Sequence, residues 1–363
     1  MSNINNNDVI LKVENLSQYF GKLKAVDHVS FEIKRGEVFG LVGESGCGKT
    51  TTGRTIIKVY EPTTGNVYLD GVRIGAGTLD YKLEIKRLRK ELKLKLANEN
   101  DAEVIKKLKL EAKQKIQVER KKIKEAEKCQ KHVSKKDVTK MQMIFQDPIG
   151  SLNPRMTVKD IVAEGLIIQG IKDKEYIDAR VYEVLEMVGL VKEHADRYPH
   201  EFSGGQRQRI GIARAIIMKP ELIIADEPVS ALDVSIQAQV INLLNDLRKE
   251  MGLAILFVAH DLSVVKYFSD RIGVMYYGKM VELADSDELF KNPLHPYTKS
   301  LLSAIPLPDP NYEKKRKRYV YNALAEHDYS VQGPTLREVK PGHFVSCNDQ
   351  EYDEIMKKLN ESK

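Results

Sequence analysis

Residues 43–50 of this chain carry side chains and spacing that suit phosphate chemistry. They read Gly-Glu-Ser-Gly-Cys-Gly-Lys-Thr and fit the phosphate-binding loop, with four variable residues between the first glycine and the Gly-Lys-Thr end. Glycines let backbone N–H groups close around phosphates, Lys49 adds a fixed positive charge, and the Thr50 hydroxyl can ligate Mg²⁺. The sequence therefore predicts a site for ATP and Mg²⁺. The expected nucleotide-binding residues here are Gly43, Glu44, Ser45, Gly46, Cys47, Gly48, Lys49, Thr50 and Thr51.

Two further runs extend this prediction from binding to hydrolysis. Residues 222–227 read as an apolar strand that ends in Asp226 and Glu227, one carboxylate placed for a metal and one for an attacking water. Residues 203–206, Ser-Gly-Gly-Gln, read as an exposed loop of small residues that opens a helix. This run separates one large family from other enzymes with phosphate loops.

The elements that must position these residues alternate along the chain. Strand and helix follow one another as a parallel α/β sheet requires. The predicted strands are 9–13, 29–33, 37–42, a hairpin over 66–74, 141–145, 221–225, 254–258 and 272–275, and the predicted helices are 51–60 and 206–218, with helical periodicity over 157–191.

Composition limits the class of protein. The 363 residues are 30% charged and 42% apolar, which predicts a globular chain with one strongly charged part. The sequence has no apolar run of 18 residues, and its first residues lack the pattern of a signal peptide. Three scattered cysteines favour a reducing compartment over a disulfide framework.

The excess positive charge belongs to one insert. Residues 82–140 hold 21 Lys and Arg against 10 Asp and Glu, whereas the whole chain has a net charge of only +6. Apolar residues recur at near-helical spacing on both sides of a break at 98–101, which predicts an antiparallel helical hairpin with a narrow apolar seam. We interpret it as a tolerated surface insertion, and the alternative is a basic arm that contacts anionic lipid, RNA or a partner protein.

Taken together, the three runs resemble those of the ATP-binding subunits of ABC transporters, over about residues 9–308. The resemblance implies a parallel-sheet core, an antiparallel β subdomain and a helical subdomain. It implies that Ser203, Gly204, Gly205 and Gln206 cap the γ-phosphate of an ATP held by an opposing subunit. By the same resemblance Gln146, which follows a predicted strand, ligates Mg²⁺ together with Thr50 and Asp226.

The remaining roles that the resemblance implies concern hydrolysis and the adenine. Glu227 corresponds to the catalytic base and His260 to the switch histidine that contacts the γ-phosphate, while Asp233 lies in the loop that crosses between subunits. Phe20 falls where the family stacks an aromatic ring on adenine, with Tyr19 as the alternative. These assignments make Glu227, His260 and Gln146 the expected catalytic set.

The C-terminal third narrows the resemblance. Residues 276–282, 289–298 and 301–310 resemble the ATPases of oligopeptide and dipeptide importers and their nickel-importing relatives, and residues 146–157 resemble the F-type subunit in particular. The implied partners are a second, D-type ATPase, two integral membrane permease subunits and, indirectly, an extracytoplasmic peptide-binding protein. The implied location is the cytoplasmic face of the cell membrane, and no nucleic acid is expected.

The domain organisation that we expect follows from these boundaries. Residues 1–305 form the nucleotide-binding domain, with the charged hairpin inserted at 82–140 and the helical subdomain at 147–202, and residues 306–363 form a C-terminal extension. A basic run at 314–318 is interpreted as a solvated patch. The alternative function is an ABC-type ATPase that binds nucleic acid or ribosomes through the basic insert.

Overall fold

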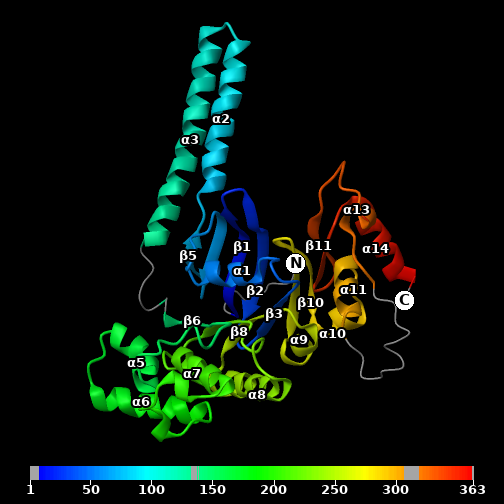
Figure 1. Ribbon diagram of the computed structural model, residues 1–363. Coiled ribbons are helices and arrows are strands. Elements are labelled where there is room, and N and C mark those ends of the chain that lie inside the picture. The colour runs from blue at the N-terminus through cyan, green and yellow to red at the C-terminus, as the bar shows by residue number, and fades with distance from the viewer. Residues whose placement is uncertain (1–7, 132–136, 138, 306–318, 362–363) are drawn as a thin grey trace.

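The chain is built around two β-sheets with a long helical hairpin and a C-terminal segment attached (Figure 1). The computed structural model describes residues 8–131, 137, 139–305 and 319–361. The basic run at 314–318 and the rest of residues 306–318 lie outside the described part. None of the helices in the described part combines the length and the apolar character that crossing a bilayer requires.

The larger sheet has eight strands, in the order β11-β12-β10-β9-β3-β8-β7-β6. Its parallel part consists of β3 (Val38–Val42), β6 (Met141–Ile144), β7 (Leu222–Asp226), β8 (Ala254–Ala259) and β9 (Arg271–Tyr276). Its antiparallel part consists of β10 (Lys279–Asp285), β11 (Thr335–Lys340) and β12 (His343–Cys347). The α/β fold class with a parallel core is thus confirmed, and the complete sheet is mixed.

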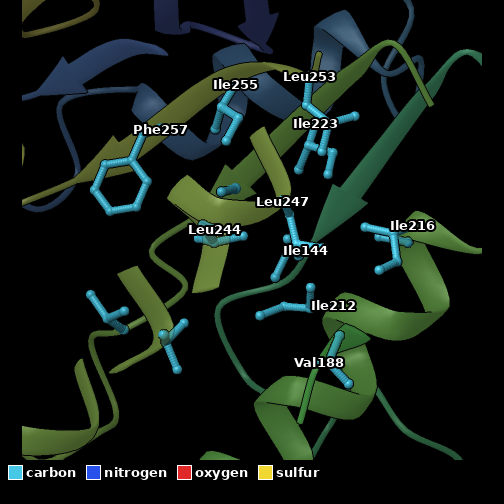
Figure 2. Close-up of a cluster of buried hydrophobic side chains, with 14 of the residues drawn as sticks. Ile144, Val188, Ile212, Ile216, Ile223, Leu244, Leu247, Leu253, Ile255 and Phe257 are labelled. Carbon is cyan, nitrogen blue, oxygen red and sulfur yellow. The ribbon is translucent and has the colours of Figure 1, made fainter. Parts of the chain in front are cut away.

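Continuous apolar runs explain why the parallel strands lie at the centre. Every residue of β3, β7 and β8 is buried, as expected for strands covered on both faces. The covering helices include α1 (Lys49–Ile56), α7 (Gly204–Ile216), α8 (Val234–Met251) and α9 (Leu262–Phe268). Figure 2 shows side chains of α7 and α8 pointing at side chains of the strands; the labelled residues are Ile144, Val188, Ile212, Ile216, Ile223, Leu244, Leu247, Leu253, Ile255 and Phe257.

The smaller sheet is antiparallel, in the order β2-β1-β4-β5. Its strands are β1 (Val9–Phe20), β2 (Leu23–Lys34), β4 (Thr64–Leu69) and β5 (Val72–Ala76). Strands β1 and β2 are longer than the apolar alternation predicts, because their pairing continues through polar residues to a tight turn after Phe20. This turn brings the end of β1 close to the phosphate loop.

The helical subdomain contains α5 (Val158–Ile168), α6 (Lys174–Met187) and two short 3₁₀ turns, η1 (Lys192–His194) and η2 (Pro199–Glu201). A reciprocal capping box between Thr157 and Asp160 begins α5, and the Asp173 side chain caps α6. Both helices fall within the span for which the sequence predicts helical periodicity.

The insert folds as two antiparallel helices, α2 (Leu79–Ala97) and α3 (Ala102–Lys131), which pack against each other and project away from both sheets (Figure 1). The break between them coincides with residues 98–101. Leu88 and Leu92 of α2 line one narrow groove with Leu108 and Ala112 of α3, as an apolar seam requires. The near-helical spacing of apolar residues in the insert begins at Leu83 and would place it in this seam, but Leu83 is 53% exposed.

The C-terminal segment returns to the central sheet. After α10 (Ser286–Lys291) and α11 (Pro296–Ser303), the described chain resumes with α13 (Ala323–Glu326), then β11, β12 and α14 (Asp349–Glu361). Strand β12 pairs with β10, so residues of the expected C-terminal extension form the edge of the same sheet as the phosphate loop. Strands β11 and β12 were not predicted from the sequence.

Candidate nucleotide-binding and hydrolysis site

The phosphate loop connects β3 to α1 and requires glycine at two positions. Gly43 and Gly48 have φ angles of 149° and 106°, a region that side chains disfavour. A Cβ atom at either position would lie 2.2 Å from a backbone oxygen, that of Met275 for Gly43 and that of Ala25 for Gly48. The loop therefore holds its conformation only with glycine at both ends.

The charged and hydrogen-bonding groups of the loop converge on one cleft. The Lys49 side chain is buried, and its Nζ donates to the carbonyl oxygens of Gly43 (2.7 Å) and Glu44 (3.0 Å). Helix α1 begins at Lys49, and its N-cap residue Gly48 has no side chain to cap the N–H groups of the first turn. An ammonium group beside a helix N-terminus makes an anion site, as phosphate binding needs.

The cleft has a volume of about 520 Å³ and brings together residues from six separated segments. Predicted site residues on its wall are Phe20, Ser45, Gly46, Gly48, Lys49, Thr50, Thr51, Gln146, Glu227 and His260. The cleft is also lined by five residues that were not predicted from the sequence: Leu23, Lys24, Ala25, Tyr277 and Gly278. Tyr277 and Gly278 form the tight turn between β9 and β10, both with positive φ, and the Tyr-Tyr-Gly sequence was a usable turn signal.

The Asp226 carboxylate is fully buried at the end of β7 and contacts Thr50, a residue of the cleft wall. Its Oδ1 accepts a hydrogen bond from Thr50 Oγ1 at 2.7 Å, while Oδ2 is buried without a hydrogen-bond partner among the described residues. Arg54 is the nearby cation, 3.8 Å from Oδ2. Burial raises the pKa of Asp226, with the Thr50 hydrogen bond acting against the rise. A buried carboxylate beside a hydroxyl suits a hard cation such as Mg²⁺.

The side chains of Gln146 and His260 both contact the Glu227 carboxylate. Glu227 Oε2 accepts a hydrogen bond from Gln146 Nε2 at 3.0 Å and lies 3.0 Å from His260 Nδ1. Glu227 has a φ of 45°, in the left-handed region, and its N–H donates to the Val258 carbonyl oxygen at 2.9 Å. Strain of this kind is retained where a side chain must be aimed. The expected catalytic set Glu227, His260 and Gln146 is thus brought together in the cleft, from the ends of β7, β8 and β6.

The Ser203–Gln206 loop and Asp233 are placed elsewhere. They do not line the nucleotide cleft of their own chain, as far as the described residues show. Ser203 Oγ accepts from the Gln206 N–H and the Gln206 side chain accepts from the Ser203 N–H, a capping box that begins α7. A Cβ at Gly205 would lie 2.6 Å from the Ile236 side chain, so this loop packs closely against α8.

The two aromatic candidates at the end of β1 differ in their surroundings. Phe20 is 44% exposed, lines the cleft and packs edge-to-face on Tyr60. The Tyr19 hydroxyl instead donates to the Asp27 carboxylate at 2.7 Å. The geometry favours Phe20 for ring stacking. Among the loop residues, the Cys47 side chain points into the apolar core, where burial raises the pKa of its thiol.

Two family models match this chain. The model described as "ABC transporter" matches residues 26–101 and 101–230, and the model described as "Oligopeptide/dipeptide transporter, C-terminal region" matches residues 281–329. The first match contains the phosphate loop, Gln146, Ser203–Gln206 and both carboxylates. The second contains most of β10 and the whole of α10 and α11.

Several curated proteins are similar to this chain over nearly their whole length, and they are named as transport proteins. The oligopeptide transport ATP-binding protein OppF of Bacillus subtilis is 54% identical over 349 residues, covering 94% of this chain and 97% of that protein. OppF of Streptococcus mutans is 48% identical, with coverage of 97% and 99%, and the dipeptide transport ATP-binding protein DppF of Lactococcus lactis is 46% identical, with coverage of 96% and 97%.

Similar solved structures are ATP-binding cassettes. The cassette MJ0796, solved as a dimer bound to ADP and Pi, has a TM-score of 0.54 and 26% identity, and the match covers 76% of this chain and 99% of that one. CbiO1 of Clostridium perfringens, at 24% identity, has a TM-score of 0.56 and coverage of 78% and 92%, which supports the fold.

Proposed function

This chain belongs to the ABC transporter family of ATP-binding subunits, and from that premise we propose that it hydrolyses ATP to power the import of oligopeptides through a membrane permease. The single observation that carries hydrolysis is the cleft in which Lys49 and Thr50 lie opposite the Glu227 carboxylate. The peptide class comes from its relatives, which are named as oligopeptide and dipeptide transport proteins. The alternative of a nucleic-acid- or ribosome-binding ATPase has no support among these relatives.

The residues of the cleft have different roles in ATP binding and hydrolysis. Lys49 and the N–H groups of the phosphate loop hold the phosphates, and Phe20 packs on the adenine ring. Glu227 orients the attacking water and accepts its proton, with Gln146 and His260 fixing the carboxylate through the contacts at 3.0 Å. Because phosphoryl transfer needs little covalent help from the protein, positioning is the main task of these groups.

Mg²⁺ fits the oxygen donors that the structure brings together. Thr50 Oγ1 and the Asp226 carboxylate are in contact, and Gln146, whose Nε2 is turned to Glu227, supplies an amide oxygen. Oδ2 of Asp226 has no hydrogen-bond partner among the described residues and lies 3.8 Å from Arg54, which leaves a buried carboxylate oxygen that a metal cation could bind. When bound, Mg²⁺ would neutralise charge on the β- and γ-phosphates.

The position of the Ser203–Gln206 loop implies that hydrolysis requires a second ATPase subunit. Since these residues and Asp233 do not line the cleft of their own chain, we propose that they complete the cleft of an opposing ATPase, the D-type subunit. Closure of the two ATPases would turn two membrane-spanning permease subunits outward, and an extracytoplasmic binding protein would deliver the peptide. The chain would then be a peripheral protein at the cytoplasmic face of the membrane.

The test identifies the subunits that co-purify with this chain and then measures the ATPase rate of the complex. We expect the chain, purified from gently solubilised membranes at low salt, to carry two multi-span permease subunits and a second ATPase, as identified by mass spectrometry. In that complex Glu227→Gln should retain ATP binding and lower the ATPase rate by about 10²–10⁴-fold, as loss of a catalytic base does. Lys49→Ala should instead weaken ATP binding.

Two outcomes would contradict the proposal. An ATPase rate near normal in the Glu227→Gln complex, with the partner ATPase silenced by the same substitution at its own site, would remove Glu227 from the base role. Ribosomal proteins or DNA in place of permease subunits would mean that the basic insert, rather than the C-terminal region, determines the function.

A further inference from the structure

A tyrosine of the C-terminal region is in direct contact with the phosphate loop. Tyr297, in α11, is 2% exposed, and its hydroxyl oxygen accepts a hydrogen bond from the backbone N–H of Glu44 at 3.0 Å. Glu44 is the second residue of the loop. Burial raises the pKa of Tyr297, so the hydroxyl stays neutral at physiological pH. The loop conformation therefore depends in part on a side chain 253 positions away.

A chain of buried hydrogen bonds fixes the position of Tyr297. The Tyr297 N–H donates to His295 Nδ1 at 3.1 Å, so His295 caps α11. Burial lowers the pKa of His295 to about 3, which keeps the imidazole neutral and able to accept at Nδ1. The N–H groups of Leu294 and His295 donate to the two carboxylate oxygens of Glu282, at 2.8 and 3.0 Å.

The same chain continues into the C-terminal strand. Glu282, in β10, is fully buried, and its Oε1 lies 2.8 Å from Nε2 of His343, in β12. His343 is itself 1% exposed. A continuous path of contacts thus runs from β12 through β10 and the start of α11 to the phosphate loop.

Aromatic packing holds the Tyr297 ring on its other side. Its centroid lies 4.4 Å from that of Tyr276 and 5.6 Å from that of Tyr321. Tyr276 immediately precedes Tyr277 and Gly278, which line the nucleotide cleft. Tyr297 therefore contacts both the phosphate loop, at Glu44, and Tyr276, which precedes the turn at Tyr277 and Gly278 in the cleft wall.

We propose that Tyr297 is a positioning residue for nucleotide: its hydroxyl fixes Glu44, and through it the C-terminal region sets the ATP affinity of its own chain. This inference rests on the proposed function, because it takes the loop to bind ATP. Phosphate binding needs the loop's N–H groups in one arrangement, and a loop that is ordered beforehand loses less conformational entropy on binding. The catalytic carboxylate belongs to Glu227, which follows β7 and has no hydrogen bond to Tyr297 among the described residues, so Tyr297 should control affinity rather than turnover.

The test removes only the hydroxyl oxygen. For Tyr297→Phe in the full chain, we expect the Kd for ATP, measured by calorimetry, and the KM for ATP in the assembled complex to rise about threefold to tenfold, the worth of one hydrogen bond. The kcat should not change. Tyr321→Phe is the matched control, since it removes a hydroxyl from the same ring cluster, and it should leave Kd unchanged.

Each other outcome has a defined meaning. An unchanged Kd in Tyr297→Phe, alongside weak binding in Lys49→Ala, overturns the inference alone, as does equal weakening by Tyr297→Phe and Tyr321→Phe. If the unaltered chain binds no ATP, the proposed function fails instead. Should Tyr297→Phe fold poorly, hydrogen exchange in the unaltered chain decides: the Glu44 amide should be protected, and free exchange there overturns the inference.

Discussion

The charged hairpin and the C-terminal segment are both additions to one ATPase core, and they are attached to it in opposite ways. Within α2 and α3 the buried residues are Ile85 and Ala126, and contact with the core is made near the base, where Cys129 Sγ donates to the Arg73 carbonyl oxygen at 2.9 Å. The C-terminal strand β12 instead joins the central sheet and buries His343 against Glu282. An addition of the second kind is part of the core that holds the nucleotide.

The ion pairs of the two regions show the same difference. In the hairpin, Arg87 pairs with Glu84 at 2.8 Å and Lys122 with Glu119 at 2.6 Å, each between neighbouring turns of one helix. Such pairs are screened by water and add little stability. The Glu282–His343 contact is buried away from water. Loss of one side chain would therefore leave a hydrogen-bonding atom of the other without that partner. Charge is abundant in the hairpin, but the buried polar contact, which matters more for stability, is made by the C-terminal segment.

The largest expected effect is therefore that of His343→Leu. It removes the His343 contact from the fully buried Glu282 carboxylate, which then keeps only the N–H donors of Leu294 and His295, so we expect the free energy of unfolding to fall by about 1–3 kcal/mol. Chemical denaturation of the full chain measures this loss. Lys122→Leu is the matched control in the hairpin and should change stability by less than about 1 kcal/mol. Equal losses in the two variants would contradict the contrast between the two regions.

A smaller effect is expected for the half-exposed pair that covers this site. Lys340 Nζ donates to Glu288 Oε1 at 2.8 Å and, with help from Asn292 and His343, lowers the pKa of Glu288 to about 2. A lowered carboxyl pKa stabilises the fold above the unfolded value near 4.5, and this contribution is lost as pH falls toward 2.

Lys340→Met should thus lower the melting temperature at pH 7 and matter less at pH 3.5. The expected cost at pH 7 is below about 1 kcal/mol, because water screens a pair at this exposure. Melting curves of both proteins at the two pH values make the comparison. A difference between them that grows on acidification would contradict the assigned role of Glu288.

The sequence predicted those parts of the site whose geometry is local. Residues 43–50 and 226–227 each form a contiguous sequence pattern, so their spacing was enough to predict them as candidates, and the hairpin break at 98–101 was visible for the same reason. The Tyr297–Glu44 contact was not predictable, because it joins residues 253 positions apart and neither has a local pattern that names the other. Strands β11 and β12 were missed because each is short and has partly exposed residues.

The smallest effect should come from shortening the hairpin. Lys122 Nζ lies over the Tyr81 ring at 5.7 Å and Leu88 shares a groove with Lys115, so residues 88 and 115 are level and can be joined. Replacing residues 89–114 by a short Gly-Ser linker keeps the base and should change the free energy of unfolding by less than about 1 kcal/mol, since changes in loop length cost little.

The ATPase rate of the assembled complex should stay unchanged in the shortened chain, because none of the residues that line the nucleotide cleft belongs to α2 or α3. The measurement pairs that rate with uptake of a labelled oligopeptide. Normal ATPase activity with lost uptake would show that the basic arm has a partner and would replace the interpretation of a tolerated insertion. A loss of both would mean that the hairpin is as closely coupled to the ATP site as β12, and this result too would remove the contrast between the two additions.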